Sequence, residues 1–207
     1  MKTFTKITFS ILAIVFTASG IANAQTSDKM APKQAEAVFA GGCFWCVEAD
    51  FEKFPGVIEA VSGYAGGHTQ DPTYKQVTRN NTGHYEVAKI IYDPAKVSYS
   101  ELVEYFWTTV DPTDAGGQFC DRGQSYATAI FATPGQIEVA RASKTALESS
   151  GRLKDKVVTP ILPAARFYKA ENYHQDYYKK NPIRYNYYRT GCRRDKRLKK
   201  LWGKKGR

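Results

Sequence analysis

The segment Gly41-Gly42-Cys43-Phe44-Trp45-Cys46 contains the residues of this chain whose types and spacing best suit a chemical reaction. Residues 37–40 form a short apolar run typical of a buried strand, and the two glycines end it just before a helical pattern of apolar residues. Cys43 is therefore expected where a strand ends and a helix begins. Unpaired backbone N–H groups and the positive end of the helix dipole stabilise an anion at such a position. The sequence thus predicts that Cys43 has a lowered pKa and reacts as a thiolate nucleophile.

The cysteines favour redox chemistry over structural bridges. A lone cysteine at a tight turn is more often buried and inert, but Cys46 follows three residues after Cys43, with two aromatic residues between them. The chain has four cysteines, and the other two, Cys120 and Cys192, lie far along it. In an oxidising compartment these four could form two disulfides by any of three connectivities. Their irregular placement suits redox cycling better than a disulfide framework.

The N-terminus has the pattern of a secretory signal. Lys2 and Lys6 precede an apolar stretch over residues 7–18, and Ala22-Asn23-Ala24 provides a cleavage site before Gln25. The stretch is shorter than the roughly 18 apolar residues of a membrane span, so an uncleaved anchor is the less favoured alternative. We expect an exported, periplasmic protein made of a signal peptide (1–24), a short polar leader (25–34), a catalytic domain (35–190) and a basic C-terminal tail (191–207).

The net charge of +10 is concentrated near the C-terminus. Residues 193–207 hold nine basic residues against Asp195 alone, whereas the preceding mature chain is close to neutral. Such a tail can contact an anionic membrane surface or an acidic partner, and the alternative is a solvated chain end. Nucleic acid is not an expected partner outside the cytoplasm. We expect a monomer.

The hydrophobic pattern predicts alternating strands and helices. Ser98 with Glu101 forms a capping box at the start of one helix. The order strand, helix, strand, strand, helix, strand predicts an α+β fold, a two-layer sandwich with a ferredoxin-like split βαβ core and long functional loops. The expected strands are 37–40, 57–64, 84–92, 126–132 and 157–162, and the expected helices begin at 44 or cover 98–110, 134–150 and 172–180.

Several separated motifs between Val38 and Tyr177 make the chain similar to the peptide methionine sulfoxide reductase A family. They are Gly41-Gly42-Cys43-Phe44-Trp45, Gly63-Tyr64-Ala65-Gly66-Gly67, Pro72-Thr73-Tyr74, Gly83-His84-Tyr85-Glu86, Asp121-Arg122-Gly123 with Ser125-Tyr126, and Tyr173-His174-Gln175. The resemblance implies reduction of the S epimer of methionine sulfoxide, free and in proteins, and hence repair of oxidised proteins. It implies no cofactor and no metal.

The resemblance also implies the roles of individual residues. The nucleophile falls on Cys43, the sulfoxide-binding acid on Glu86, and two phenol donors on Tyr74 and Tyr126. Phe44 and Trp45 would receive the S-methyl group, and the entrance would be lined by Asp121, His174 and Tyr177. The chemistry suits these types, because a sulfoxide oxygen leaves poorly unless an acid protonates it. Glu86 would then need a pKa raised by burial.

Attack leaves Cys43 as a sulfenic acid, which a second thiol condenses into a disulfide for a thioredoxin-like dithiol to reduce. Cys192 and Cys46 are both candidate resolving cysteines. We favour Cys192, because Gly191 lets that segment move and Arg193 with Arg194 would stabilise its thiolate. Cys46 has the closer spacing but is expected to point into the core.

Two other functions fit part of the pattern. Cys43 and Cys46 could belong to a general thiol–disulfide oxidoreductase that uses a C-x-x-C pair, although the Phe44-Trp45 insert is unusual for one. A metal-binding protein could use Cys43, Cys46, Cys120 and a histidine. Zinc sites usually combine two closely spaced ligand pairs, and Cys120 has no near partner in the sequence.

Overall fold

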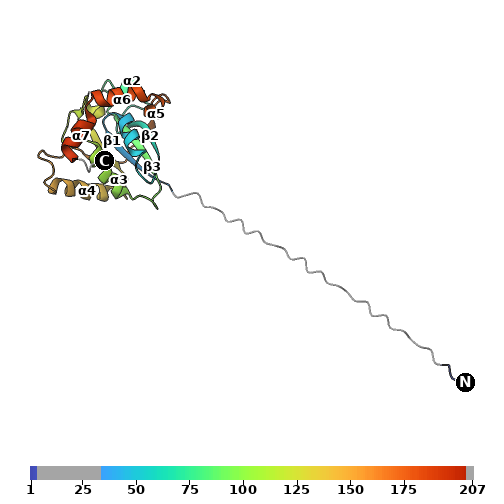
Figure 1. Ribbon diagram of the computed structural model, residues 1–207. Helices are drawn as coiled ribbons and strands as arrows, with labels where there is room; N and C mark the ends of the chain where they lie inside the picture. Colours follow the sequence, from blue (N-terminus) through green and yellow to red (C-terminus); the bar gives the residue numbers. More distant parts are fainter. Residues whose placement is uncertain (4–33, 204–207) are drawn as a thin grey trace. The chain divides into compact units, whose positions relative to one another are not determined.

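The computed structural model describes residues 1–3 and 34–203 of the 207-residue chain (Figure 1). The expected signal peptide (1–24) and polar leader (25–34) therefore lie outside the described residues, except for residues 1–3 and 34. Among the described residues, no helix has the length and apolar character needed to cross a membrane.

A six-stranded mixed sheet forms the centre of the domain, in the order β7-β6-β1-β3-β2-β8. The pairs β6/β1, β1/β3 and β3/β2 are antiparallel, so β1 and β2 run in the same direction with β3 between them. This is the split βαβ arrangement, and the predicted α+β class is confirmed. The strands of this sheet are β1 (Ala35–Gly41), β2 (Val57–Ala65), β3 (Tyr85–Tyr92), β6 (Thr128–Ala132), β7 (Ile161–Pro163) and β8 (Tyr168–Lys169).

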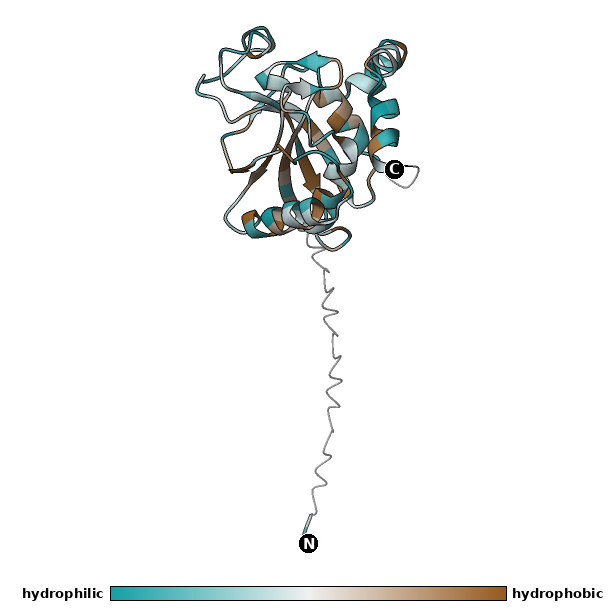
Figure 2. Cartoon of the chain, turned by 90° about the vertical axis from the view of Figure 1, so that its left-hand side faces the viewer, coloured by the Kyte–Doolittle hydropathy of each residue, from teal (hydrophilic) through white to brown (hydrophobic). Residues whose placement is uncertain are grey.

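Alternation along the strands gives the sheet two apolar faces. On β1, Ala37 and Phe39 face the helices, whereas Val38 and Ala40 belong to the opposite cluster. The Phe39 ring stacks on Phe51 at 5.1 Å between ring centroids. In Figure 2 the hydrophobic residues gather on the strands and on the helix faces that pack against them. The core helices are α1 (Phe44–Phe51), α3 (Tyr99–Thr109) and α4 (Ile137–Ser149).

Local sequence signals explain where these elements begin. The Ser98 side chain accepts from Glu101 N at 3.2 Å, and the Glu101 carboxylate accepts from Ser98 N at 2.8 Å, so α3 has the predicted capping box. The other boundaries shift by a few residues: the helix expected from 134 begins at Ile137, and the strand expected at 157–162 is β7. The shorter elements are α2 (Tyr74–Val77), β4 (Gly117–Gln118), β5 (Asp121–Arg122) and the 3₁₀ turn η1 (Gln124–Tyr126).

The C-terminal region differs most from the expectation. The helix expected at 172–180 is only α5 (Tyr177–Lys180), and it is followed by α6 (Pro182–Gly191) and α7 (Arg194–Trp202). The segment expected as a separate basic tail (191–207) therefore includes a helix of the domain. Leu198 and Trp202 of α7 lie in the main core, and Trp202 Nε1 donates to the carbonyl oxygen of Val110 at 3.0 Å. The basic residues of α7 obscured this apolar face in the sequence.

Candidate active site

Cys43 lies at the junction between β1 and α1, as predicted. It is the N-cap residue of α1, and Cys46 N donates to its carbonyl oxygen at 3.0 Å. The turn requires glycine before it, because Gly42 has φ +80° and an added Cβ would lie 2.6 Å from Gln118 Cβ. Gln118 is itself fixed by hydrogen bonds to both the N–H and the carbonyl of Asp111. The strand-to-helix turn is therefore held closely against a buried residue of β4.

Cys43 and Cys46 form a buried pair of free thiols, 5% and 2% exposed. Burial raises the pKa of Cys43, and the adjacent Cys46 and the carboxyl of Glu86 raise it further. The hydrogen bond from Cys43 lowers the pKa of Cys46 to about 7, and the charges of Arg194 and Arg189 lower it too, against the opposing effect of burial. The direction for Cys43 is the opposite of the one predicted, because burial and its neighbours outweigh the helix end. Cys46 is the better stabilised thiolate.

Glu86 projects from β3 beneath this turn and is 1% exposed. Its Oε2 accepts from Phe44 N at 3.1 Å, while its Oε1 makes no hydrogen bond to any residue that the structure describes. Burial raises the pKa of Glu86 to about 8, against the lowering effects of the Phe44 N–H and the nearby Tyr126 hydroxyl. Glu86 is therefore a neutral acid at pH 7 with a free proton to donate, which is the state that the chemistry requires.

Tyr74 and Tyr126 are two phenols beside this acid. Burial, followed by the neighbouring Glu86, raises the pKa of Tyr74 to about 12 and raises that of Tyr126 further. Both hydroxyls remain protonated donors. Glu171, which the sequence analysis did not identify, positions this side of the site: it accepts from Tyr74 N at 2.9 Å and from the hydroxyl of Tyr64 at 2.9 Å. No recognisable motif marks Glu171 in the sequence.

Aromatic rings from three segments form one wall. Phe44 is buried, and its ring centroid lies 4.9 Å from that of His174. Trp45 stacks on Tyr177 at 3.8 Å, and its Nε1 donates to His174 Nδ1 at 3.0 Å. Burial lowers the pKa of His174 to about 4, so the imidazole is neutral and can accept this bond. The structure thus brings these predicted residues together around an apolar site.

Asp121 lies on β5 at the other side of the thiol pair, where its charge raises the pKa of Cys43. Burial raises the pKa of Asp121 itself. Its carboxylate accepts from the hydroxyl of Tyr188, whose ring packs edge-on against Trp45 at 5.9 Å. Tyr188 was missed in the sequence because a tyrosine-rich stretch gives no sign of which ring turns inward.

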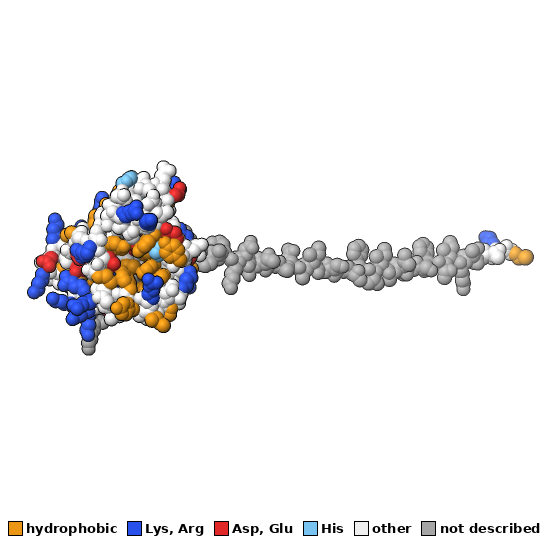
Figure 3. Space-filling view, turned by 90° about the horizontal axis from the view of Figure 1, so that it is seen from above, with side chains coloured by type: hydrophobic (Ala, Val, Ile, Leu, Met, Phe, Trp, Pro, Cys, Tyr) orange, Lys and Arg blue, Asp and Glu red, His pale blue; other side chains and the backbone are white. Residues whose placement is uncertain are grey.

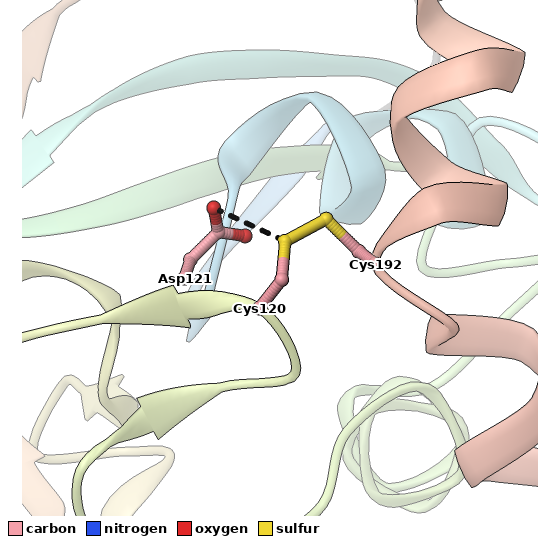
Figure 4. A group of neighbouring side chains, drawn as sticks. All are labelled: Cys120, Asp121 and Cys192. Carbon is pink, nitrogen blue, oxygen red and sulfur yellow. Dashed lines mark hydrogen bonds between the residues drawn. A yellow bond between two sulfur atoms is a disulfide. The ribbon is translucent and has the colours of Figure 1, made fainter.

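The remaining cysteines are joined to each other. A disulfide links Cys120, in the turn between β4 and β5, to Cys192 at the end of α6, with Cα atoms 4.8 Å apart (Figure 4). This is not the arrangement favoured from the sequence, in which Cys192 would bond to Cys43. Nor are Cys43, Cys46 and Cys120 gathered as a metal-ligand set among the described residues, since Cys120 is bonded elsewhere. Seventy-two positions separate the two bonded cysteines, and only the fold brings them together.

The face that includes α2, α5 and α6 is apolar at its centre and basic toward one edge (Figure 3). Large exposed hydrophobic side chains in this part of the chain are Tyr173, Ile183 and Tyr187. The exposed basic side chains of α7 are Lys196, Lys199 and Lys200.

Comparisons with known proteins identify one family. The sequence matches the family described as "Peptide methionine sulfoxide reductase" over residues 35–206. It is 52% identical over 194 residues to Peptide methionine sulfoxide reductase MsrA 2 of Caulobacter vibrioides, covering 93% of this chain and 98% of that one. It is 51% identical over 177 residues to MsrA of Bacillus subtilis, covering 85% and 100%.

Solved structures give the same result for the fold. Methionine sulfoxide reductase A of Corynebacterium diphtheriae superposes with a TM-score of 0.66 at 34% identity, covering 74% of this chain and 78% of that one. Mxr1 from Saccharomyces cerevisiae in its reduced form superposes with a TM-score of 0.66 at 31% identity, covering 72% and 87%.

Proposed function

This chain belongs to the peptide methionine sulfoxide reductase family and reduces methionine sulfoxide, and we propose that Cys43 is the thiol that attacks the sulfoxide sulfur. The observation that carries this assignment is the buried acid beside it. Glu86 is held under the Cys43 turn by the Phe44 N–H at 3.1 Å, and its second oxygen has no partner among the described residues. A neutral carboxyl with an unused oxygen costs free energy in a buried site unless a ligand uses it. The sulfoxide oxygen is a suitable acceptor.

In the first step the oxygen passes from the substrate sulfur to the Cys43 sulfur. Glu86 donates its proton to the sulfoxide oxygen, and the hydroxyls of Tyr74 and Tyr126 donate hydrogen bonds to it. The thiol proton of Cys43 restores the acid. The sulfoxide gains two electrons and becomes a thioether, and Cys43 loses two and becomes a sulfenic acid. No external oxidant or metal is needed for this balance.

The site places three different groups around the sulfoxide sulfur. Cys43 approaches the sulfur, the acid and phenols hold its oxygen, and the aromatic surface of Phe44 and Trp45 receives its methyl group. A tetrahedral sulfur that meets three fixed partners fits in one configuration only. We therefore assign the enzyme to a single epimer, which the sequence resemblance indicates is the S form.

Cys46 is the thiol that we propose for the second step. It is paired with Cys43 in the structure, whereas Cys192 is bonded to Cys120. The Cys46 thiol releases its proton and attacks the Cys43 sulfur as the thiolate, the hydroxyl takes up one proton in its place and leaves as water, and a Cys43–Cys46 disulfide forms. A thioredoxin-type dithiol then reduces this bond by thiol–disulfide exchange and is itself oxidised.

We also propose that the protein is exported and repairs oxidised proteins outside the cytoplasm. The signal pattern over residues 1–24 supports periplasmic export, and the Cys120–Cys192 disulfide supports an oxidising compartment, where such bonds persist. We propose a monomer, whose exposed lysines on α7 can contact an anionic membrane surface. Cell fractionation and the N-terminal sequence of the mature protein test the export.

The deciding experiment is one turnover without reductant. The wild type mixed with one equivalent of each methionine sulfoxide epimer should release methionine from the S form alone and lose two free thiols. Cys43→Ser should fold but release no methionine, even with excess dithiothreitol. Cys192→Ser is the matched control and should release methionine at the wild-type rate. Methionine release by Cys43→Ser above a trace would remove Cys43 as the nucleophile.

A further inference from the structure

A buried cluster of charges joins α1 to the two C-terminal helices near Cys46. Asp50 follows Cys46 by four residues, so the two side chains share one face of α1. Arg189 of α6 contacts the Asp50 carboxylate at 2.9 Å and the Asp195 carboxylate at 2.8 Å. Arg194 of α7 also approaches the Asp50 carboxylate, at 3.8 Å. The reaction steps described above use none of these charged residues.

Arg194 differs from Arg189 in its partners. It is 2% exposed, and its guanidinium donates to the carbonyl oxygens of Gly41 at 3.1 Å and Thr109 at 2.8 Å. Its Nε makes no hydrogen bond to a described residue and lies 3.8 Å from Asp50 Oδ2. The short contact of Asp50 is to Arg189. Among the described residues, Arg194 therefore has one ion pair, the long one with Asp50, and no hydrogen-bonded carboxylate.

A buried cation whose nearest carboxylate is distant and shared with a second arginine is poorly compensated. The bond to the Gly41 carbonyl places Arg194 beside the turn that carries the thiol pair, and its Nη1 lies 3.8 Å from the position of an added Cβ on Gly42. Asp50 pairs closely with Arg189 and only at 3.8 Å with Arg194, so the Arg194 charge is left to stabilise a thiolate on Cys46, four residues before Asp50 on α1. We propose that Arg194 is a positioning residue of the reductase, whose buried cation holds Cys46 as the thiolate that condenses with oxidised Cys43.

The connection between α6 and α7 suits this role. Cys192 is tied to Cys120, and Arg193 adopts a left-handed conformation with φ 55°, which turns the chain before Arg194 enters the core. Leu198 and Trp202 then anchor α7. The segment that carries Arg194 is thus anchored on both sides. This fixes the position of the guanidinium, as electrostatic stabilisation of a thiolate requires.

The charge of Cys46 depends on every ionisable group around it. The hydrogen bond from the Cys43 thiol lowers the pKa of Cys46 most, burial raises it, the charges of Arg194 and Arg189 lower it and that of Asp50 raises it, with a net value of about 7. Tyr185, Tyr188, Tyr177 and Tyr178 pack near it from α5 and α6, Glu86 interacts with it from β3, and Asp195 pairs with Arg189.

This inference rests on Cys46 being the resolving thiol, so the test separates the two claims. In the Cys43→Ser background with the disulfide intact, Cys46 is the only free thiol of the chain. The ultraviolet absorbance of the thiolate then gives the Cys46 pKa directly, with no turnover. Arg194→Met should raise that pKa by about 1 to 3 units, the usual effect of losing a close opposite charge. Arg194→Gln keeps a donor for the Gly41 carbonyl and should also raise the Cys46 pKa. It takes the place of Arg194→Met in the titration if that variant does not fold.

The control is Arg197→Met, on the same helix, which removes the contact of Arg197 with Asp111 Oδ2 at 2.7 Å. It should leave the Cys46 pKa unchanged, and Arg194→Lys, which keeps the charge, should restore a value near that of the wild type. An unchanged Cys46 pKa in a folded Arg194→Met or Arg194→Gln protein would overturn the proposal.

Single turnover with Cys43 present gives the kinetic consequence. Methionine release should be unchanged in Arg194→Met, whereas decay of the sulfenic acid at pH 7 should slow about 10-fold or more and recover as the pH rises. A deficit that is the same at every pH would overturn the proposal. If peptide mapping instead shows Cys43 bonded to Cys192, the resolving role of Cys46 fails, while the titration result for Arg194 still stands.

Discussion

Glu86→Gln should make the protein more stable at neutral pH while removing most of its activity. The pKa of Glu86 is about 8 in the folded protein, against 4.5 in an exposed chain. Below pH 4.5 both states are protonated. Above it the unfolded chain releases the proton and the folded protein keeps it, so the stability of the wild type falls as the pH rises. Between pH 4.5 and about 8, the wild type therefore loses roughly 5 kcal/mol of its free energy of unfolding, at about 1.4 kcal/mol for each pH unit.

Glutamine does not titrate, so the free energy of unfolding of the variant lacks this dependence on pH. Its amide oxygen can accept from Phe44 N as Oε2 of Glu86 does, and any constant cost of the unpaired amide is the same at every pH. Urea unfolding of both proteins under non-reducing conditions, from pH 4.5 to 8, should show the difference in free energy of unfolding growing in favour of the variant. Parallel stability curves would mean that Glu86 is ionised in the folded protein, and the mechanism would lose its acid.

The activity of the same variant tests the acid independently. The amide keeps a hydrogen-bond donor but cannot transfer a proton, so methionine release in a single turnover should fall by roughly 10²-fold or more. In the wild type the first step should also weaken as the pH rises through about 8, where Glu86 loses its proton. An unchanged rate in Glu86→Gln between pH 6 and about 8 would remove Glu86 from the reaction.

Three further outcomes are expected. Tyr74→Phe should slow methionine release by about 10²-fold, because one donor to the sulfoxide oxygen is lost; a wild-type rate in rapid-quench assays would show that this hydroxyl does not contact the oxygen. In Cys192→Ser, peptide mapping after one equivalent of substrate should show a Cys43–Cys46 bridge, and continued cycling with thioredoxin would fit that assignment, whereas loss of the bridge would contradict it. Trp202→Ala should lower the free energy of unfolding by about 3–5 kcal/mol, measured in urea, because it empties a buried core position; a loss below about 1 kcal/mol would mean that α7 is separable from the domain.

Local patterns predicted much of the fold and the substrate side of the site. A glycine pair between an apolar strand and an apolar helix is a local signal, and it located Cys43 correctly. The capping box of Ser98 and Glu101 located α3 in the same way. Glu86 and Tyr126 have no such signal of their own, so their placement depended on resemblance to a family. The structure brings them together because β3 and the end of η1 meet under the Cys43 turn.

The parts that the sequence did not predict depend on long-range contacts. The thiol pKa of Cys43 was expected to be low from the helix end alone, yet enclosure by residues from other elements raises it. The Cys120–Cys192 bond joins a two-stranded hairpin to the end of a helix, and no pattern in either segment predicts that pairing. Sequence spacing also could not tell which of two thiols would be free beside Cys43.

The C-terminal segment shows why charge alone misleads. Arg194, Leu198 and Trp202 recur at four-residue intervals, which is the spacing of one helix face, but nine basic residues in 193–207 favoured a solvated tail. A lysine or arginine is expected at the surface because burying its charge is costly. That expectation fails where the fold surrounds the charge with hydrogen-bond acceptors and a negative partner. The burial of Arg194 beside the thiol pair therefore turns an apparently solvated chain end into part of the environment of Cys46. Residues 41–50 and 189–194 contact each other only in the folded chain. The dependence of the Cys46 thiol on Arg194 therefore follows from tertiary structure alone.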